Sequence, residues 1–137
     1  MVTNTALTVR YCETDRMGIV HHSRYYPWFE VGRTAWMKAL GYSYGQMEED
    51  GVLLPLTETH CSYLRGAKYE DELVIQTRLT ALSAARCTFA YTVLRGGDIL
   101  AKGQTMHGFV DGSFKPVNLK KSRPVLWGKL AAALEEG

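Results

Sequence analysis

The spacing of apolar residues changes once along the chain, from the period of a helix to the period of strands. Over residues 28–40 the apolar positions recur at helical spacing, and the face they form is too wide for a helix exposed on one side. Gly41 follows, where a glycine commonly ends a helix, while Ser23 is expected to cap the start and Pro27 to lie near the first turn. The pattern predicts one helix that other elements surround.

After this helix, apolar and polar residues alternate with the period of two that is typical of β-strands. Valine, isoleucine, threonine and aromatic residues, which favour strands, are frequent there. The pair Gly96 and Gly97 predicts a two-residue hairpin turn, and residues 83–85 predict a softer one. Strands are therefore expected over residues 52–63, 73–82, 86–94 and 99–110, with a short first strand over 6–11 and a terminal helix over 125–135.

These elements predict an α+β fold in which a five-stranded antiparallel sheet wraps around one buried helix. The chain of 137 residues, with 46% hydrophobic and 22% charged residues, has the size and composition of one globular domain over residues 1–137. An open sheet of this kind has edge strands, which commonly pair with a second copy. We therefore expect a homo-oligomer, either a dimer or a dimer of dimers (a homotetramer).

Charge and cysteine content exclude several classes of function. The formal net charge of +2 is too small to indicate nucleic acid as the main partner. The three cysteines, Cys12, Cys61 and Cys87, are odd in number and lack C-x-x-C spacing, so neither a disulfide framework nor a zinc site is expected. The chain has no signal-peptide pattern and no apolar run that approaches ~18 residues. A cytoplasmic protein without membrane insertion is predicted.

Candidate chemistry gathers in the loop between the first strand and the buried helix. This loop holds Tyr11, Asp15, Gly18 and the adjacent histidines His21 and His22, just before a helix N-terminus. Unpaired backbone N–H groups at such a terminus favour negative charge, either on an anion or on a carbonyl oxygen that becomes one. The two histidines and the aspartate lack a third ligand at suitable spacing, so no metal site is expected.

The loop contains the stretch Thr14-Asp15-x-x-Gly18-Ile19-Val20-x-His22-x-x-Tyr25. This stretch and a second one, over residues 63–73, resemble the 4-hydroxybenzoyl-CoA thioesterase branch of the hotdog superfamily. The position of His22, seven residues after Asp15, resembles the pattern of the subgroup named for the Tol–Pal system of Gram-negative bacteria. The second stretch, residues 63–73, resembles the approach to the third strand in this family. Gly66 stands where many relatives have proline, a change expected to affect a turn and not the chemistry.

The resemblance implies a hotdog fold and an acyl-CoA thioesterase that needs no cofactor. Asp15 would attack the carbonyl as a nucleophile or activate water as a general base, and the sequence leaves both routes open. Backbone N–H groups of His22 and Ser23 would polarise the thioester oxygen, the His22 ring would orient the carbonyl or water, and Tyr11 would hydrogen-bond the carboxylate or the substrate. A thiol with a pKa near ~8.5 leaves without a strong general acid.

The phosphates of coenzyme A need cations, and two basic clusters offer them. Arg65 and Lys68, with Gly18 of the loop, are expected to contact the substrate; an acyl carrier protein would use the same basic surface. Large side chains near the expected acyl pocket indicate a short-chain or aromatic acyl group; they are Trp28, Trp36, Tyr42, Tyr44 and Met47. The second basic cluster comprises Lys115, Lys120, Lys121 and Arg123.

Other functions stay open at this point. The same fold carries enoyl-CoA hydratases and dehydratases, which act on a 3-hydroxyacyl chain with an acid/base pair. A non-catalytic acyl-CoA-binding or sensor protein is a second alternative, although a pure binder does not need Asp15 beside a thioester carbonyl. The cluster over residues 115–123 alone favours a nucleic-acid or membrane-surface protein, and the near-neutral net charge of +2 opposes that interpretation.

Overall fold

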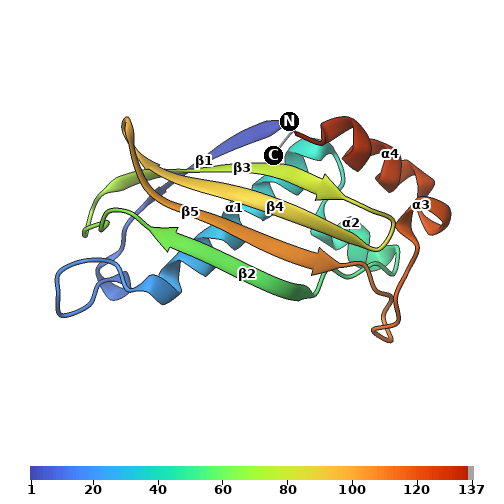
Figure 1. Cartoon of the computed structure of the whole chain (residues 1–137), viewed down its shortest axis with the longest axis horizontal. Coiled ribbons are helices and arrows are strands. Elements are labelled where there is room, and N and C mark those ends of the chain that lie inside the picture. The colour runs from blue at the N-terminus through green and yellow to red at the C-terminus, as the bar shows by residue number, and fades with distance from the viewer. Residues whose placement is uncertain (136–137) are drawn as a thin grey trace.

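The structure of residues 1–135, a computed structural model, consists of a curved five-stranded antiparallel sheet that wraps one side of a long helix (Figure 1). The strand order is β1-β3-β4-β5-β2, so β1 and β2 form the two edges of the sheet. This arrangement confirms the predicted α+β architecture. The strands are β1 (Val2–Thr8), β2 (Leu56–Tyr63), β3 (Glu72–Leu82), β4 (Arg86–Arg95) and β5 (Asp98–Gly108).

The buried helix α1 (Tyr25–Leu40) begins earlier than its apolar periodicity predicted, with Pro27 in the first turn. Gly41 ends it in the left-handed conformation with φ of 87°, as expected. The prediction that Ser23 caps the helix is wrong. Arg24 holds the cap position, because a short 3₁₀ turn, η2 (His22–Arg24), leads directly into α1 and includes Ser23.

Two glycines let α1 lie close against the sheet. A Cβ atom at Gly32 of the helix would lie 2.4 Å from the Thr77 Oγ1 of β3. A Cβ at Gly103 of β5 would lie 2.4 Å from the ring of Phe29, which stacks on Tyr91 with ring centroids 4.5 Å apart. The close contact fixes where the helix N-terminus lies relative to the ends of the strands.

The remaining differences from the predicted elements lie near the ends of the sheet. The first strand is β1 rather than residues 6–11, because its pairing with β3 starts at Val2, opposite Arg78. The second strand starts at Leu56 rather than at residue 52. The predicted hairpin turn at residues 96–97 is confirmed by the pairing of Arg95 with Asp98. Three α-helices complete the described chain. The helices α2 (Tyr44–Glu49) and α3 (Leu119–Ser122) were not predicted, and α4 (Pro124–Ala133) corresponds to the terminal helix predicted over residues 125–135.

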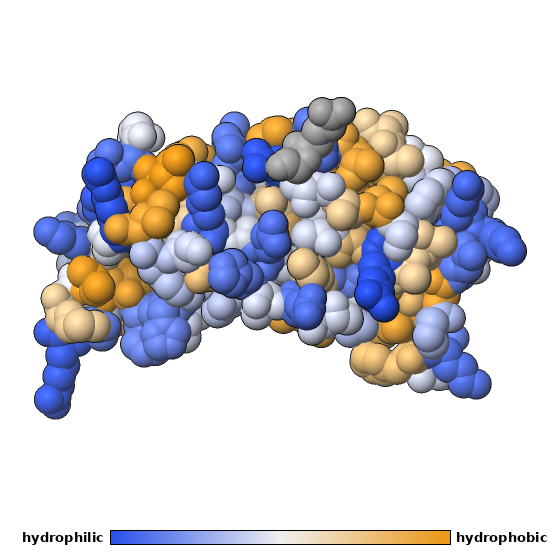
Figure 2. Space-filling view, viewed as in Figure 1, coloured by the Kyte–Doolittle hydropathy of each residue, from blue (hydrophilic) through white to orange (hydrophobic). Residues whose placement is uncertain are grey.

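One sheet face and one sheet edge stay open to solvent in this chain. The face opposite α1 carries polar side chains, and Figure 2 shows that the middle of this side of the molecule is largely hydrophilic. Strand β2 pairs with β5 on one side and is exposed along most of its length. Among residues 1–135, no helix combines the length and hydropathy that crossing a bilayer requires.

Candidate functional site

The loop before α1 folds into a narrow hairpin that holds Asp15. Thr14 and Val20 form an isolated antiparallel bridge, and the N–H of Asp15 donates to the Ile19 carbonyl at 2.9 Å. The turn needs the left-handed conformation of Gly18, whose φ is 82°. The Val20 N–H donates to the carbonyl of Ala67 at 2.8 Å, which ties the hairpin to the segment after β2.

Asp15 is half-buried as a residue, and its carboxylate is held from one side. Its Oδ1 accepts the backbone N–H of Met17 at 2.8 Å, a local turn bond that aspartate commonly makes. Among the described residues, Oδ2 has no hydrogen-bond donor. One carboxylate oxygen is therefore fixed while the other is available to a ligand.

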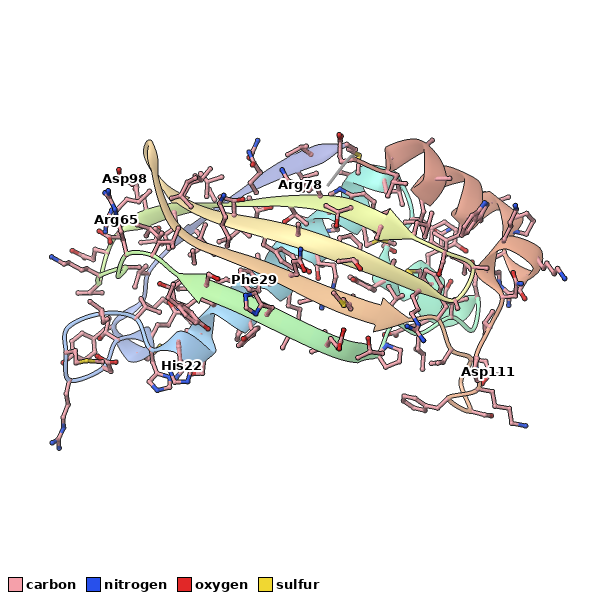
Figure 3. All side chains as sticks on the ribbon, in the orientation of Figure 1. His22, Phe29, Arg65, Arg78, Asp98 and Asp111 are labelled. Carbon is pink, nitrogen blue, oxygen red and sulfur yellow. The ribbon has the colours of Figure 1, made fainter. Side chains whose placement is uncertain are left out.

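Asp15 lines an open cleft with a volume of about 460 Å³, within the range of small-molecule sites. Figure 3 shows two of its lining residues, His22 and Arg65, at the same end of the sheet. The cleft thus combines an acid, a cation and two imidazoles with apolar walls. Its lining residues are Asp15, Met17, Ile19, Val20, His21, His22, Tyr25, Tyr63, Leu64, Arg65 and Gly66.

The two predicted oxyanion donors differ in their hydrogen bonding. The N–H of Ser23 donates to the Nδ1 of His21 at 3.3 Å, whereas the N–H of His22 has no acceptor among the described residues. The His22 carbonyl accepts the hydroxyl of Tyr63 at 3.3 Å, which ties the turn to the end of β2. Of the two backbone groups, His22 N–H is the one left for a substrate oxygen.

The structure brings together some of the predicted site residues and separates others. Arg65 lines the cleft and pairs with Asp98 at 3.1 Å. Lys68 is exposed outside the cleft lining, and Gly18 lies in the hairpin turn. Tyr11 is 75% exposed, packs edge-to-face on Tyr69, and makes no hydrogen bond to Asp15.

Gly66 lines the cleft, and the expectation that this glycine does not affect the chemistry stays a prediction. A Cβ at Gly66 would lie 2.7 Å from the Cγ2 of Ile19, which also lines the cleft. The absence of a side chain at this position therefore lets Ile19 occupy space that proline would take. A side chain at residue 66 would therefore require Ile19 to move.

Sequence reasoning missed two residues that support the loop, Glu13 and Tyr63. Tyr63 packs edge-to-face on Tyr25 with centroids 5.1 Å apart, and its place at the end of a strand gave no sign of this contact. Partial desolvation, followed by the neighbouring groups of Cys61 and Tyr26, raises the pKa of Tyr63, so its phenol stays protonated and able to donate. Glu13 is a buried acid just before the hairpin, and an acid in a loop normally suggests solvent exposure.

Sequence comparison decides the family. A model described as the thioesterase-like superfamily matches residues 9–127. The chain belongs to the thioesterase-like superfamily. This result confirms the predicted hotdog-fold acyl-CoA thioesterase family, and the described sheet and helix agree with it.

Individual relatives of this superfamily member cover nearly its whole length. Bacillus subtilis (strain 168) YneP, named provisionally as an acyl-CoA thioesterase, is 38% identical over 125 residues, or 90% of this chain and 91% of that protein. The acyl-CoA thioesterase YbgC of Haemophilus influenzae is 30% identical over 115 residues, or 82% of this chain and 85% of that protein. The structure of DHNA-CoA thioesterase from Staphylococcus aureus superposes with a TM-score of 0.91 at 28% identity, covering 96% of this chain and 89% of that one.

Proposed function

We propose that this thioesterase-superfamily chain hydrolyses an acyl-CoA thioester to a free acid and coenzyme A, with Asp15 as the central carboxylate. The observation that carries the proposal is the held carboxylate of Asp15 in the same cleft as the His22 turn. Relatives named as acyl-CoA thioesterases over most of the chain length support the reaction class.

The geometry supports a different role for each polar group in the cleft. The thioester oxygen would accept the N–H of His22, so that negative charge developing on it faces a fixed dipole. The Oδ2 of Asp15 would then attack the carbonyl carbon or take a proton from the attacking water. In both routes water supplies the new oxygen of the acid, and the sulfur of coenzyme A leaves as a thiolate. The Ser23 N–H, engaged by His21, would contribute less than His22.

The cleft walls favour a short-chain or aromatic acyl group. Ile19, Val20, Tyr25 and Leu64 offer apolar contact beside Asp15. The similarity to a DHNA-CoA thioesterase, at 28% identity, supports an aromatic acyl group in particular. Arg65 at the cleft would meet the charged end of coenzyme A, and the exposed Lys68, which is not among the lining residues, would add positive charge. An acyl carrier protein would present the same negative charge to these residues.

We also infer that the chain assembles as a homo-oligomer, a dimer or a dimer of dimers, through its exposed edge strand. Strand β2 has an unpaired outer edge, and Tyr63 at its end lines the cleft. Pairing of β2 with a second copy would therefore bring that copy close to the acyl site. The cytoplasmic location stays a prediction, supported by the free cysteines Cys12, Cys61 and Cys87. The Tol–Pal-associated subgroup also stays a prediction, supported by the spacing of His22 from Asp15.

The first test is thiol release, detected with a thiol-reactive dye, across short-chain, long-chain and aromatic acyl-CoAs. The Asp15→Asn variant keeps the size and a turn oxygen but loses the base, and we expect its kcat to fall by about 10²-fold or more. Asp111→Asn is a matched control, since Asp111 Oδ1 also accepts turn N–H groups, at 2.8 Å from Ser113, but lies at the opposite end of the sheet (Figure 3). We expect Asp111→Asn to keep wild-type turnover.

The other outcomes point to other functions. Full activity in Asp15→Asn would remove catalysis from this carboxylate. Binding of acyl-CoA without any thiol release would favour the sensor alternative. Hydration of an enoyl-CoA without thiol release would favour a hydratase or dehydratase.

A further inference from the structure

Glu13 is the one buried acidic side chain in the described part of the chain, and it lies directly before the Asp15 hairpin. Its residue surface is 3% exposed, although it belongs to a short 3₁₀ turn, η1 (Tyr11–Glu13), in the loop. An ionised carboxylate is costly to bury unless hydrogen-bond donors surround it. The position of such a group beside the candidate site calls for a physical explanation.

Both carboxylate oxygens of Glu13 are satisfied by donors from different elements. Oε1 accepts the backbone N–H of Arg10, after β1, at 2.7 Å. Oε2 accepts the indole N–H of Trp28, from α1, at 2.9 Å, and lies 3.5 Å from the Arg10 guanidinium. The side chain thus joins the end of the first strand to the first turns of the buried helix.

The backbone of Glu13 connects the same point to the far side of the hairpin. Its carbonyl accepts the N–H of His21 at 2.9 Å, just after Val20 closes the hairpin with Thr14. Both ends of the segment that carries Asp15 therefore meet at Glu13. The next residue after this bond is His22, whose N–H is the free donor in the cleft.

The charge state of Glu13 suits this connecting role. Burial opposes ionisation, but the N–H donors of Arg10 and Trp28 and the charge of Arg10 outweigh it and hold the pKa of Glu13 below 4.5. The carboxylate therefore stays ionised at neutral pH and accepts from both donors at once. A neutral amide of the same shape would accept from one donor and oppose the other.

We propose that Glu13 is a positioning residue for the reaction: its buried carboxylate fixes the base of the Asp15 hairpin against Trp28 of α1. The inference rests on the proposed function, because it assigns Glu13 a role in that reaction. The role is indirect, since Glu13 is assigned no contact with substrate. Its effect is to hold the spacing between the Asp15 carboxylate and the His22 N–H. Misplacement of a reacting group by about 1 Å can cost roughly 10²-fold in rate.

The sharpest test removes the indole donor while keeping the aromatic core. Trp28→Phe deletes the N–H that Glu13 accepts, and we expect kcat to fall by roughly 10-fold with KM changed less than about two-fold. Trp36→Phe is the matched control on the same helix, because its indole N–H donates to the Met1 carbonyl at 3.1 Å and, contrary to the expectation from sequence, neither Trp36 nor Trp28 is among the residues that line the cleft. Both variants lose one hydrogen bond of a buried indole, but only the first touches Glu13.

A double variant distinguishes positioning from general loss of stability. In Glu13→Gln one amide N–H faces a backbone or indole N–H, so we expect a larger fall in kcat, of roughly 10²-fold. Adding Trp28→Phe removes the opposed indole donor. The double variant should therefore be no slower than Glu13→Gln alone, so that the two effects do not multiply.

Amide hydrogen exchange gives a readout that does not depend on turnover. The N–H groups of the hairpin residues Asp15, Gly18, Val20 and His21 are all hydrogen-bonded, that of Val20 to the Ala67 carbonyl outside the hairpin. They should lose protection in Trp28→Phe and keep it in Trp36→Phe. Unchanged protection in Trp28→Phe, or equal falls in kcat for both tryptophan variants, would overturn the proposal. If the wild type releases no thiol from any acyl-CoA, the proposed function fails, and exchange alone still decides whether Glu13 holds the hairpin.

Discussion

We predict that the protein loses stability at mildly acidic pH through one buried histidine, His107 of β5. The side chain is 1% exposed and belongs to an interior chain of hydrogen bonds. Its Nδ1 lies 3.1 Å from the Leu54 carbonyl, which accepts only, so Nδ1 carries the proton and Nε2 accepts the Thr105 hydroxyl at 2.8 Å. Thr105 in turn accepts from Tyr91 at 2.6 Å, and Tyr91 accepts from Arg33 at 3.0 Å.

A second proton on His107 would break this chain at Nε2. Burial, followed by the nearby charge of Arg33, lowers the pKa of His107 from 6.5 to about 4. The unfolded chain therefore takes up the proton first as the pH falls, so stability is complete above pH 6.5 and declines toward pH 4. At about 1.4 kcal/mol for each pH unit between the two values, roughly 2.5 kcal/mol of the free energy of unfolding is lost between about pH 7 and about pH 4.5.

Urea unfolding of the wild type and of His107→Gln across this range measures the effect. Glutamine keeps an acceptor and a donor but does not titrate, so we expect a variant less stable at neutral pH whose stability is nearly constant down to pH 4.5. His60→Gln is the control, since His60 is exposed on β2, and it should keep the wild-type slope. A flat wild-type profile, or a steep one in His107→Gln, would show that another group governs the acid response.

Two further substitutions test the packing of the helix and the support of the cleft. Gly32→Ala places a Cβ 2.4 Å from Thr77 Oγ1 and should lower the free energy of unfolding by about 1–3 kcal/mol. Gly128→Ala in α4 is the control, because its Cβ meets nothing within 4 Å and should not destabilise the protein. Urea unfolding measures both variants. Tyr63→Phe removes the hydroxyl that donates to the His22 carbonyl, and should reduce kcat several-fold with little change in melting temperature, because the side chain is 44% exposed. A large stability loss in Tyr63→Phe would assign the bond to folding rather than to the site.

The sequence predicted the fold because its two dominant signals are local. These signals are the helical spacing of apolar residues over residues 28–40 and the alternation of apolar and polar residues after residue 52. Both can be recognised without knowing what the elements pack against. The start of α1 was harder, since the turn at residues 22–24 continues into the helix and Pro27 is tolerated in its first turn. The first strand was misplaced because its limits come from pairing with β3, which no local pattern contains.

The candidate site likewise has residues that the sequence predicts and supporting contacts that only the fold reveals. Asp15 and His22 lie in one short segment with a family pattern, and the structure places both on the cleft. The contacts that support them join residues far apart in sequence: Tyr63 reaches the His22 carbonyl from the end of β2, and Trp28 reaches Glu13 from α1. Spacing along the chain carries no information on such pairs, so the supporting residues emerge only from the folded geometry.

The supporting contacts also explain how a loop can act as a precise site. Loops are generally the more mobile part of a fold, yet reacting groups need placement to within a fraction of an ångström. Here hydrogen bonds join the hairpin to the Ala67 carbonyl after β2 and to the Glu13 carbonyl at its base. The Tyr63 hydroxyl donates to the His22 carbonyl and so holds the turn before α1. Each tie leads to an element that packs on the core, so the loop takes its rigidity from the sheet and from α1. The close packing of that helix through Gly32 is therefore part of the same construction: moving α1 on the sheet would move Trp28, and with it the carboxylate that holds the hairpin.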